Sequence, residues 1–532
     1  MHAFLALLTF IAILFIVAGA LIIRKAPQRQ LSAEPIIETP QYPTQPLFID
    51  TPFAENLSIN EPLFPDTICS IADFGAIGDG TTSNTIAFEK AIESCDQLGG
   101  GKVIVPAGVF LTGPIHLRSN INLHIERDAT ILFSPNPKEY LPVVFSRFEG
   151  IEYYNYSPPI YAKDATNIAI TGVGTIRGQG ALTWWKFTPK ATKNINKLYA
   201  MGDDNVPVEE RVFGTETDAL RPSFIEFVSC NNVLIENVNI FNGPMWTIHP
   251  IYSNHIVIRG VNIVTSPGPS TDGIAIDSSS YVLIEDSTFS TGDDAIVLKS
   301  GRDRDGMRVH RPTENIVIRN NSIKDSHAAI AIGSEMSGDV RNVFVSDITI
   351  NKSQFGFRIK ASLGRGGIVE NIWIQDMAMR NINIRAIQLT TSYGTPFRPT
   401  STAIPIFRNI HVKNITAGKT AGSIEIIGLV EMPIRDISFE NISLPSKYGI
   451  YIKHTDAIDF TNTNITLGKD RPLFTIVNSA HTSMNHVPCE EGLSTCLLVQ
   501  GEKTENINIQ GTMFKENTIN ISEEVRPDVI AQ

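Results

Sequence analysis

Three segments of the chain share one pattern: NVLIENVNI at residues 232–240, HIVIRGVNI at 255–263 and YVLIEDSTF at 281–289. Each segment opens with a polar or aromatic residue and continues with alternating aliphatic side chains. Alternation of this kind places successive side chains on opposite faces of a β-strand. Further copies of the pattern begin at Asn167, Asn315, Asn342, Asn371, Asn409, Asp436, Ala457 and Asn506.

The spacing of these copies indicates a solenoid. Between residues 232 and 457 the starting points lie 21 to 38 residues apart, and a period in this range is typical of repeat architectures. We therefore expect an all-β, single-stranded, right-handed parallel β-helix, with inward Val and Ile forming the core and Asn side chains laddering through the turns. Leucine-rich repeats need a Leu-x-x-Leu-x-Leu pattern that is missing, and an ordinary sandwich would not keep this phase over ten copies.

One segment near the start of the repeats reads as a helix. Residues 81–98 place Phe88, Ala91 and Ile92 on one face, and the glycines at 99–101 end the helix. A solenoid needs a cover at its end. We expect this short helix to cap the first coil.

Composition narrows the classes of function. The chain has 532 residues with a net charge of -11 and a pI of about 5.5. A solenoid can absorb this length in one elongated domain. An acidic protein is a poor general binder of nucleic acid, so no nucleic-acid partner is expected. If the substrate is itself acidic, the basic groups must be concentrated at the site.

The five cysteines show no metal-ligand spacing. Cys489 and Cys496 are close enough to close a small loop, Cys69 and Cys95 form another conceivable pair, and all five could also be free. Cys230 lies in an apolar run and reads as core.

The N-terminal part predicts export. Residues 1–25 form an apolar signal or anchor segment whose uncharged run, 3–23, is long enough to span a bilayer. The alternative is cleavage after Ala18-Gly19-Ala20, which would leave a secreted or periplasmic protein. Basic residues follow this run rather than precede it, which on charge alone would leave the body in the cytoplasm. We nevertheless expect an exported body that touches the membrane only through this segment.

Three further regions complete the expected organisation. Residues 26–65 are rich in proline and read as an extended linker. Residues 66–515 should form the β-helix, and residues 516–532 a polar C-terminal tail. We expect a monomer.

Reactive side chains recur at similar phases of successive repeats. Asp272 lies 17 residues after the start at His255, Asp293 lies 12 after Tyr281, and His327 lies 12 after Asn315. Similar phase means a similar position around the solenoid, and adjacent coils are about 4.8 Å apart. Taken singly, an Asp-Gly pair is usually a turn and a lone His is usually structural. Their shared phase instead predicts one cleft.

The same phase adds further charges to that cleft. Asp294 follows Asp293, and Arg358 and Lys360 lie 16 and 18 residues after Asn342. Clustered carboxylates suit glycoside hydrolysis, in which one carboxyl must hold a proton and another must activate water. Arg and Lys suit an acidic sugar, and the loop from 299 to 311 adds further basic residues, which its own aspartates could balance.

These residues resemble the signatures of the polygalacturonases, glycoside hydrolase family 28. The family's motifs Asn-Thr-Asp, Gly-Asp-Asp, Gly-His-Gly and Arg-Ile-Lys are matched in order by Ser270-Thr271-Asp272, Gly292-Asp293-Asp294, Ser326-His327-Ala328 and Arg358-Ile359-Lys360. The segment Ala72-Asp73-Phe74-Gly75-Ala76 also looks like the family's opening. The resemblance covers about residues 66 to 515.

The resemblance implies an inverting hydrolase of pectin that uses no metal or cofactor. By this likeness Asp293 is the proton donor, Asp272 and Asp294 activate water, and His327 tunes the protonation of the site. Arg358 and Lys360 would hold the uronate carboxylate, with Tyr393 as a further substrate contact.

Two other residues resemble substrate-binding positions of bacterial and plant relatives. Trp246 and His249 occur there with a longer loop that closes one end of the cleft, which hints at cutting from a chain end. The alternative interpretation is structural: Trp246 would pack in the core, and His249 would lie in a turn. Ser270, Ser326 and Ala328 depart from the family pattern without removing a reactive group.

Two alternatives share the predicted scaffold. One is a pectate lyase, which would use calcium and an Arg or Lys base, and the other is a non-catalytic polysaccharide-binding protein. The sequence leaves the pectic polymer open between homogalacturonan, rhamnogalacturonan and xylogalacturonan.

Overall fold

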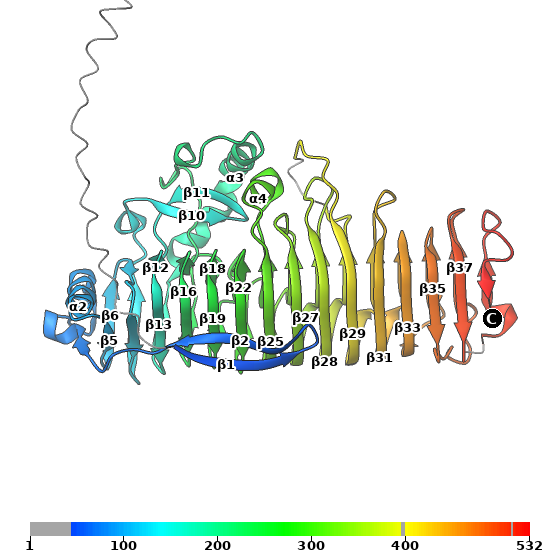
Figure 1. The fold of residues 1–532 in the computed structure, drawn as a ribbon, viewed down its shortest axis with the longest axis horizontal. Coiled ribbons are helices and arrows are strands. Elements are labelled where there is room, and N and C mark those ends of the chain that lie inside the picture. The colour runs from blue at the N-terminus through cyan, green and yellow to red at the C-terminus, as the bar shows by residue number, and fades with distance from the viewer. Residues whose placement is uncertain (1–43, 395–398, 512–513, 532) are drawn as a thin grey trace, which may run out of the picture. The chain divides into compact units, whose positions relative to one another are not determined.

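The computed structural model describes residues 44–394, 399–511 and 514–531. Most of these residues form coils that stack one on the next, so that the strands in Figure 1 lie side by side in chain order from blue to red. Every strand of the coils pairs in parallel with the equivalent strand of the next coil. The expected all-β parallel β-helix is confirmed, and its strands fall into three columns along the stack.

The first column contains the repeat starts that the sequence pattern identified. Its strands are β3 (Ile68–Ser70), β5 (Gly101–Val105), β8 (Ile121–Ile125), β13 (Thr166–Gly172), β16 (Asn231–Glu236), β19 (Asn254–Arg259), β22 (Ser280–Glu285), β25 (Thr313–Asp325), β27 (Val340–Lys360), β28 (Ile368–Thr390), β29 (Ile406–Gly422), β31 (Ile434–Tyr448), β33 (Thr455–Leu467), β35 (Ala480–Asn485), β37 (Glu505–Gln510) and β39 (Ile530–Ala531).

The second column follows the first in each coil. Its separate strands are β4 (Asp79–Ser83), β6 (Gly108–Thr112), β9 (Ala129–Phe133), β14 (Thr175–Arg177), β17 (Asn239–Phe241), β20 (Asn262–Val264) and β23 (Thr288–Ser290). From β25 onward the first and second columns run together in long, bent strands.

The third column carries the reactive residues. Its strands are β7 (Ile115–His116), β12 (Ile160–Lys163), β15 (Ile225–Val228), β18 (Ile248–Ile251), β21 (Ile274–Asp277), β24 (Ile296–Lys299), β26 (Ala328–Gly333), the ends of β27 and β28, β30 (Ile424–Ile427), β32 (Ile450–Lys453), β34 (Phe474–Val477), β36 (Leu497–Gln500) and β38 (Ile519–Ile521).

The core is a stack of aliphatic side chains that repeats once per coil. One row of the first column runs in register through Ile168, Val233, Ile256, Val282, Ile316, Val343, Ile372, Ile410, Ile437, Ile458, Thr482 and Ile507. All of these side chains are buried, and burial of each Val or Ile stabilises the fold by roughly 1.5–3 kcal/mol.

A bend in the backbone explains why Asn recurs at the repeat starts. All eleven starts have a left-handed backbone, with φ between 52° and 59°, and Asn tolerates this conformation better than most residues. The Asn side chains also bond from coil to coil. Asn371 donates to Asn342 at 3.1 Å and accepts from Asn409 at 2.6 Å. The expected Asn ladder is confirmed.

The expected linker over residues 26–65 is wrong in its second half. Strands β1 (Thr44–Thr51) and β2 (Ala54–Pro62) form an antiparallel hairpin that packs on the first column. In this part of the helix the outward positions are apolar as well, as at Leu234, Val257 and Leu283. The hairpin buries these side chains under Leu57 and Ile59, among others, which a mobile linker could not do. Residues 26–43 lie outside the described residues.

The C-terminal boundary also needs correction. Residues 519–521 and 530–531, placed in a polar tail, form β38 and β39, which pair with β36 and β37. Val525 and Val529 join the same core cluster as the coils. The segment therefore closes the last coil, and the β-helix extends beyond residue 515.

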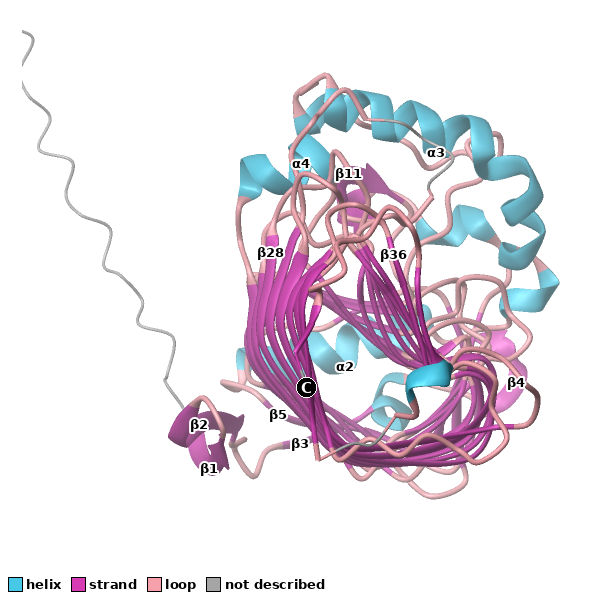
Figure 2. Ribbon diagram, turned by 90° about the vertical axis from the view of Figure 1, so that its right-hand side faces the viewer, coloured by secondary structure: helices cyan, strands magenta, loops and turns pink. Residues whose placement is uncertain are grey.

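At the other end, the expected capping helix is present as α2 (Thr85–Gln97). It is shorter at its start than expected because residues 79–83 form β4. Phe88, Ala91 and Ile92 are buried against the first coil. Two further helices, α3 (Thr188–Asp203) and α4 (Asp303–Val309), lie beyond the third column (Figure 2).

The cysteines follow the expectation in part. Cys489 and Cys496 form a disulfide with a Cα–Cα distance of 5.8 Å. Cys69 and Cys95 are free thiols buried in the core, as is Cys230.

Within the described ranges, no helix is long and apolar enough to cross a membrane. The apolar run at 3–23 lies outside those ranges.

The Asn ladder generates a prediction about stability. Asn371→Ala removes both side-chain hydrogen bonds and also places Cβ of Ala in a left-handed backbone, whereas Asn371→Gly removes the same bonds without that strain. Thermal or denaturant unfolding should show a larger loss for Asn371→Ala, by about 0.5–1 kcal/mol after allowing for the entropy of Gly. Equal losses would show that the backbone conformation contributes nothing to the choice of Asn.

Candidate active site

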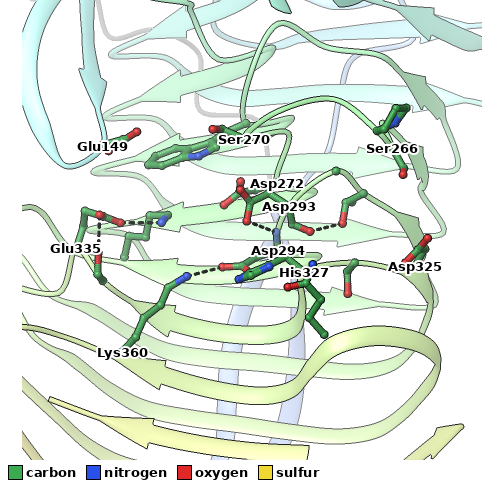
Figure 3. A pocket seen from close by; sticks show the side chains of 18 of the residues that line it. Glu149, Ser266, Ser270, Asp272, Asp293, Asp294, Asp325, His327, Glu335 and Lys360 are labelled. Atoms are coloured by element: carbon green, nitrogen blue, oxygen red, sulfur yellow. Dashed lines mark hydrogen bonds and ion pairs between the residues drawn. The ribbon is translucent and has the colours of Figure 1, made fainter. Parts of the chain in front are cut away.

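A cavity of about 610 Å³ lies on the outer side of the third column. Figure 3 shows its centre, where Asp272, Asp293, Asp294 and His327 gather while Lys360 reaches toward Asp294. Each of the three aspartates stands in the turn that leads into a third-column strand, β21 or β24, and His327 stands directly before β26. The cleft predicted from the repeat phase is thus present, with these side chains in its wall.

Backbone register brings the side chains together. The amide of Gly273, next to Asp272, donates to the Asp294 carbonyl at 2.9 Å, and the His327 amide donates to the Asp293 carbonyl at 3.0 Å. These bonds hold neighbouring coils in step. As a result, oxygens of the three carboxylates all lie within 4.8 Å of one another.

Two of the three aspartates hold protons unusually well. Burial raises the pKa of Asp272 well above its usual range, and the nearby charge of Asp293 raises it further. Burial and the charge of Asp294 likewise raise the pKa of Asp293. Asp293 is the only partly exposed member of this group, since Asp272 and Asp294 are buried.

The third aspartate remains ionised. Burial alone would raise the pKa of Asp294, but Lys360, His327 and Lys299 outweigh burial and lower it. Asp294 Oδ2 lies 3.0 Å from Lys360 Nζ, and Oδ1 accepts the Ala328 amide at 3.1 Å. The site therefore combines two carboxyls whose pKa is raised with one whose pKa is lowered.

His327 and Arg358 lie next to the three aspartates. Arg358 Nη1 lies 3.2 Å from His327 Nε2, and since a guanidinium can only donate, this nitrogen accepts. The guanidinium also stands 4.1 Å from the ring centre of Phe355 and 5.2 Å from that of Tyr393. Tyr393 lines the cavity as predicted, while Arg358 lies behind His327 and Tyr393, largely buried.

The sequence analysis did not single out several of the lining residues as site residues, Lys299 and Glu335 among them. Lys299 and Glu335 form an ion pair of 2.7 Å, and Lys299 also stands 4.5 Å from the ring centre of Trp246. Nearby cations, Lys299 first, lower the pKa of Glu335 despite its burial. Lys299 begins the basic loop at 299–311, and this position in the sequence could have marked it as a site residue. No feature of the sequence marks Glu335 in this way.

Most of that basic loop does not face the cavity. Arg302 pairs with Glu149 and Glu335 at 3.4 Å, and Arg308 pairs with Asp305 at 2.9 Å. Arg302, directly before α4, attaches the helix to its surroundings, whereas the pair of Arg308 and Asp305 lies within the helix. The structure therefore agrees better with the second interpretation of this loop, in which nearby carboxylates balance its basic residues, than with a basic surface that faces the substrate.

An insertion lies over one end of the site. Strands β10 (Val144–Phe148) and β11 (Ile151–Asn155) form a hairpin that stands with α3 and α4 above the coils in Figure 1. Glu149, in the turn of this hairpin, lines the cavity. The Arg302 amide donates to the Gly150 carbonyl at 3.0 Å, and a Cβ at Gly150 would come within 2.8 Å of that amide nitrogen. The turn is therefore held tightly against the coils.

The two residues expected at the substrate have different positions. Trp246 lines the cavity and also packs in a buried cluster, and its contact with substrate stays a prediction. The prediction that His249 contacts substrate is corrected, because its side chain is fully buried and does not line the cavity. Its Nδ1 lies 2.9 Å from Ser223 Oγ and 3.3 Å from Glu226, and its Nε2 lies 3.6 Å from Asp277. Its ring packs edge-on against Trp246, so its effect on the cavity is indirect.

The residues that depart from the family signatures lie around the trio without blocking it. Ser270 and Ser326 line the cavity, and Ser326 Oγ lies 2.9 Å from Ser353 Oγ. Ala328 packs beneath it against Phe355. Its backbone supplies the bond to Asp294, which any residue other than proline could donate.

The three carboxylates are also the kind of cluster that can hold a metal ion. Here, however, Lys360 and Lys299 stand beside them and supply positive charge. A hard cation such as Ca²⁺ needs six to eight oxygen ligands, and the positive charge of these ammonium groups would repel it. That the site works without a metal stays a prediction.

Comparison with known proteins places the chain in a family. Residues 213–469 match the model of glycosyl hydrolases family 28. A probable polygalacturonase of Vitis vinifera is 33% identical over 390 residues, which cover 70% of this chain and 74% of that protein. The chain belongs to glycosyl hydrolases family 28. The family match spans every predicted site residue from Trp246 to Tyr393.

Two further relatives extend the family-28 comparison. An exo-poly-alpha-D-galacturonosidase of Dickeya chrysanthemi is 29% identical over 395 residues, covering 68% of this chain and 64% of that protein. The crystal structure of a hyperthermoactive exopolygalacturonase from Thermotoga maritima is similar at 38% identity with a TM-score of 0.68, covering 80% of this chain and 93% of that one. The chain is thus a glycosidase on the parallel β-helix scaffold.

Proposed function

We propose that this chain hydrolyses glycosidic bonds of a galacturonic-acid polysaccharide, working inward from a chain end. The observation that carries the proposal is the carboxylate trio of mixed protonation, set in a cavity that also contains Lys299 and Lys360. Family membership and the names of the relatives agree with it. They also disfavour a calcium-dependent lyase or a purely binding protein on the same scaffold.

The protonation pattern suggests a role for each carboxyl. Asp293 gives its proton to the oxygen of the leaving sugar, because its pKa is raised and it is the partly exposed member. Asp294 remains ionised and accepts a proton from the attacking water, which Asp272 helps to orient. General acid and base catalysis of this kind contributes about 10²–10⁴-fold for each group.

Positive groups would recognise the acidic sugar. Lys360 and Lys299 place ammonium groups in the cavity, and Arg358 supplies a guanidinium behind His327. The charge of protonated His327 lowers the pKa of the adjacent Asp293 and Asp294, whereas neutral His327 can accept from Arg358 and has no such effect. This is how His327 would tune the protonation of the trio.

The spacing of the carboxylates bears on stereochemistry. Retaining glycosidases place their two carboxyl groups about 5–5.5 Å apart and inverting ones about 6.5–9.5 Å apart, whereas the nearest oxygens here lie within 4.8 Å. We still propose inversion, because both oxygens of Asp294 are engaged by Lys360 and Ala328 and are poorly placed to attack carbon. An attacking water between Asp272 and Asp294 meets no such obstacle.

The insertion supports action at a chain end. The turn at Glu149 and Gly150 stands at one side of the cavity, held by Arg302. The cavity is also lined by Lys352 and Gln354 of β27, on the coil that follows His327. A polymer could leave the cavity over this coil but would meet the insertion in the other direction.

Galacturonans are polymers outside the cell that uses them, so we further propose that the body is exported. The apolar run at 3–23 would serve either as an anchor or as a cleaved signal. We propose a monomer, as one chain carries the whole trio and the residues around it.

The products of polygalacturonate test the reaction. Proton NMR of an early time course should show sugars released with the anomeric configuration opposite to that of the cleaved bond, and chromatography should show one short product from the start. A retained configuration would contradict the role of water between Asp272 and Asp294. A broad ladder of oligomers at early times would contradict action at a chain end.

The role of the acid can be tested with an isosteric pair. Asp293→Asn removes the proton donor and should lower kcat about 10²–10⁴-fold. Asp325→Asn is the matched control, because Asp325 lines the same cavity but pairs with Lys352 at 2.9 Å outside the trio. It should retain most of the activity. If both variants lose activity equally, the loss reflects the charge of the cavity and not proton transfer.

Lys360 should set the acidic limit of activity. Since Lys360 lowers the pKa of Asp294, Lys360→Met should raise that pKa. Asp294 works as a carboxylate, so activity is lost as pH falls through its pKa, and the variant should lose activity at a higher pH than the parent. The measurement is kcat against pH. Lys352→Met, which removes an ammonium paired with Asp325, should leave this limit in place, and an unshifted limit in Lys360→Met would remove Asp294 from the role of base.

A further inference from the structure

A second groove lies on the third column, on the coils that follow the catalytic cavity. It has a volume of about 330 Å³ and is lined by Arg385, Glu425, Tyr448, Tyr451 and Arg471, among others. These residues come from β28, β30, β31, β32 and the loop before β34. The sequence analysis did not single out any of them.

Strand register places the groove in line with the cavity. Ala328, whose amide binds Asp294, pairs with Phe355, and Phe355 pairs with Arg385. A neighbouring row runs from Arg358 through Gln388 and Glu425 to Tyr451. Because Arg358 and Tyr451 are three coils apart, this row spans about 14 Å. One outward face therefore connects the two sites.

The groove offers an aromatic surface next to a cation. Tyr448 is 47% exposed, and the Arg471 guanidinium stands 4.3 Å from its ring centre. Among the described residues, Arg471 has no ion pair. The only carboxylate lining the groove, Glu425, accepts from Arg385 and from Gln388, each at 2.6 Å. The charge of Glu425 is thus matched by Arg385, and Arg471 remains available for an anion.

We propose that this groove is a remote binding site for the galacturonan chain whose end occupies the catalytic cavity. The inference rests on the proposed function and goes beyond it. A sugar ring would lie against Tyr448, since the apolar faces of sugars pack on exposed aromatic rings, and Arg471 would bind a uronate carboxylate. Arg358 and Gln388 lie along the path between the two sites.

The position of the insertion agrees with a polymer that runs from the cavity toward the groove. In Figure 1 the hairpin of β10 and β11 stands above coils that precede β27 and β28 along the stack. On the proposed path, a chain with one end in the cavity continues over the later coils, toward the groove. The guanidinium of Arg471, at the surface of the groove, matches the charge of the proposed occupant.

The test compares long and short substrates in the full chain. In the double variant Tyr448→Ala, Arg471→Ala, the ratio of kcat/KM for polygalacturonate to kcat/KM for trigalacturonate should fall about tenfold, mainly through KM for the polymer. Arg177→Ala is the matched control. Its guanidinium also stands over an aromatic ring, 4.8 Å from the centre of Phe241, but it belongs to the second column. That variant should keep the ratio of the parent.

Calorimetric binding of a long oligogalacturonide separates the groove from catalysis. In the Asp293→Asn background, which should not turn the ligand over, the two groove substitutions should weaken affinity about tenfold. If the ratio of kcat/KM values and the affinity for the oligogalacturonide are both unchanged, the groove is not a galacturonan-binding site. The proposed function would remain intact. Absence of hydrolysis by the parent enzyme would overturn the proposed function, and the binding measurement would then still decide whether the groove holds galacturonan. Both exposed side chains can be replaced without opening the core, and unfolding curves would check this.

Discussion

Parallel pairing of each coil with the next, in register, is the constraint on which the rest of this molecule depends. Backbone bonds such as Gly273 to Asp294 and His327 to Asp293 leave no freedom to slide by one residue, because a slip would turn inward Ile and Val to the outside. The same bonds force side chains from separate coils to a spacing of about 4.8 Å. Three carboxylates stand together because the core does not allow them to move apart.

The short distances between the carboxylates have an electrostatic cost, and this cost helps to set the pKa of each carboxyl. Burial and mutual repulsion would drive all three aspartates toward the neutral form. Lys360 and Lys299 reverse this for Asp294 alone, as its pKa falls while those of Asp272 and Asp293 rise. A rigid wall and two lysines thereby produce neighbouring carboxyls in different protonation states, which glycoside hydrolysis requires.

The features predicted from the sequence are those that one coil and its neighbour determine. Alternation gave the strands, and counting from each repeat start placed Asp272, Asp293 and His327 in one cleft. The features that were missed depend on segments far apart in the chain. Leu234 and Val257 point outward and looked exposed until the hairpin at 44–62 covered them. His249 also points outward from β18, and β10, about a hundred residues earlier, covers it. Strand pattern reveals which way a side chain faces but not what lies above it.

The balance of charge decides how such a protein can hold an acidic polymer. A net charge of -11 repels a polyanion at long range, so attraction must come from groups in direct contact. Most cations near the cavity are already engaged: Lys360 with Asp294, Lys299 with Glu335 and Arg302 with two glutamates. A uronate carboxylate entering the cavity must share these cations with buried partners, which weakens each contact. Binding that is spread over several sugars, including some near an unshared cation such as Arg471, can make up this deficit without adding charge beside the trio, where it would disturb the protonation that catalysis needs.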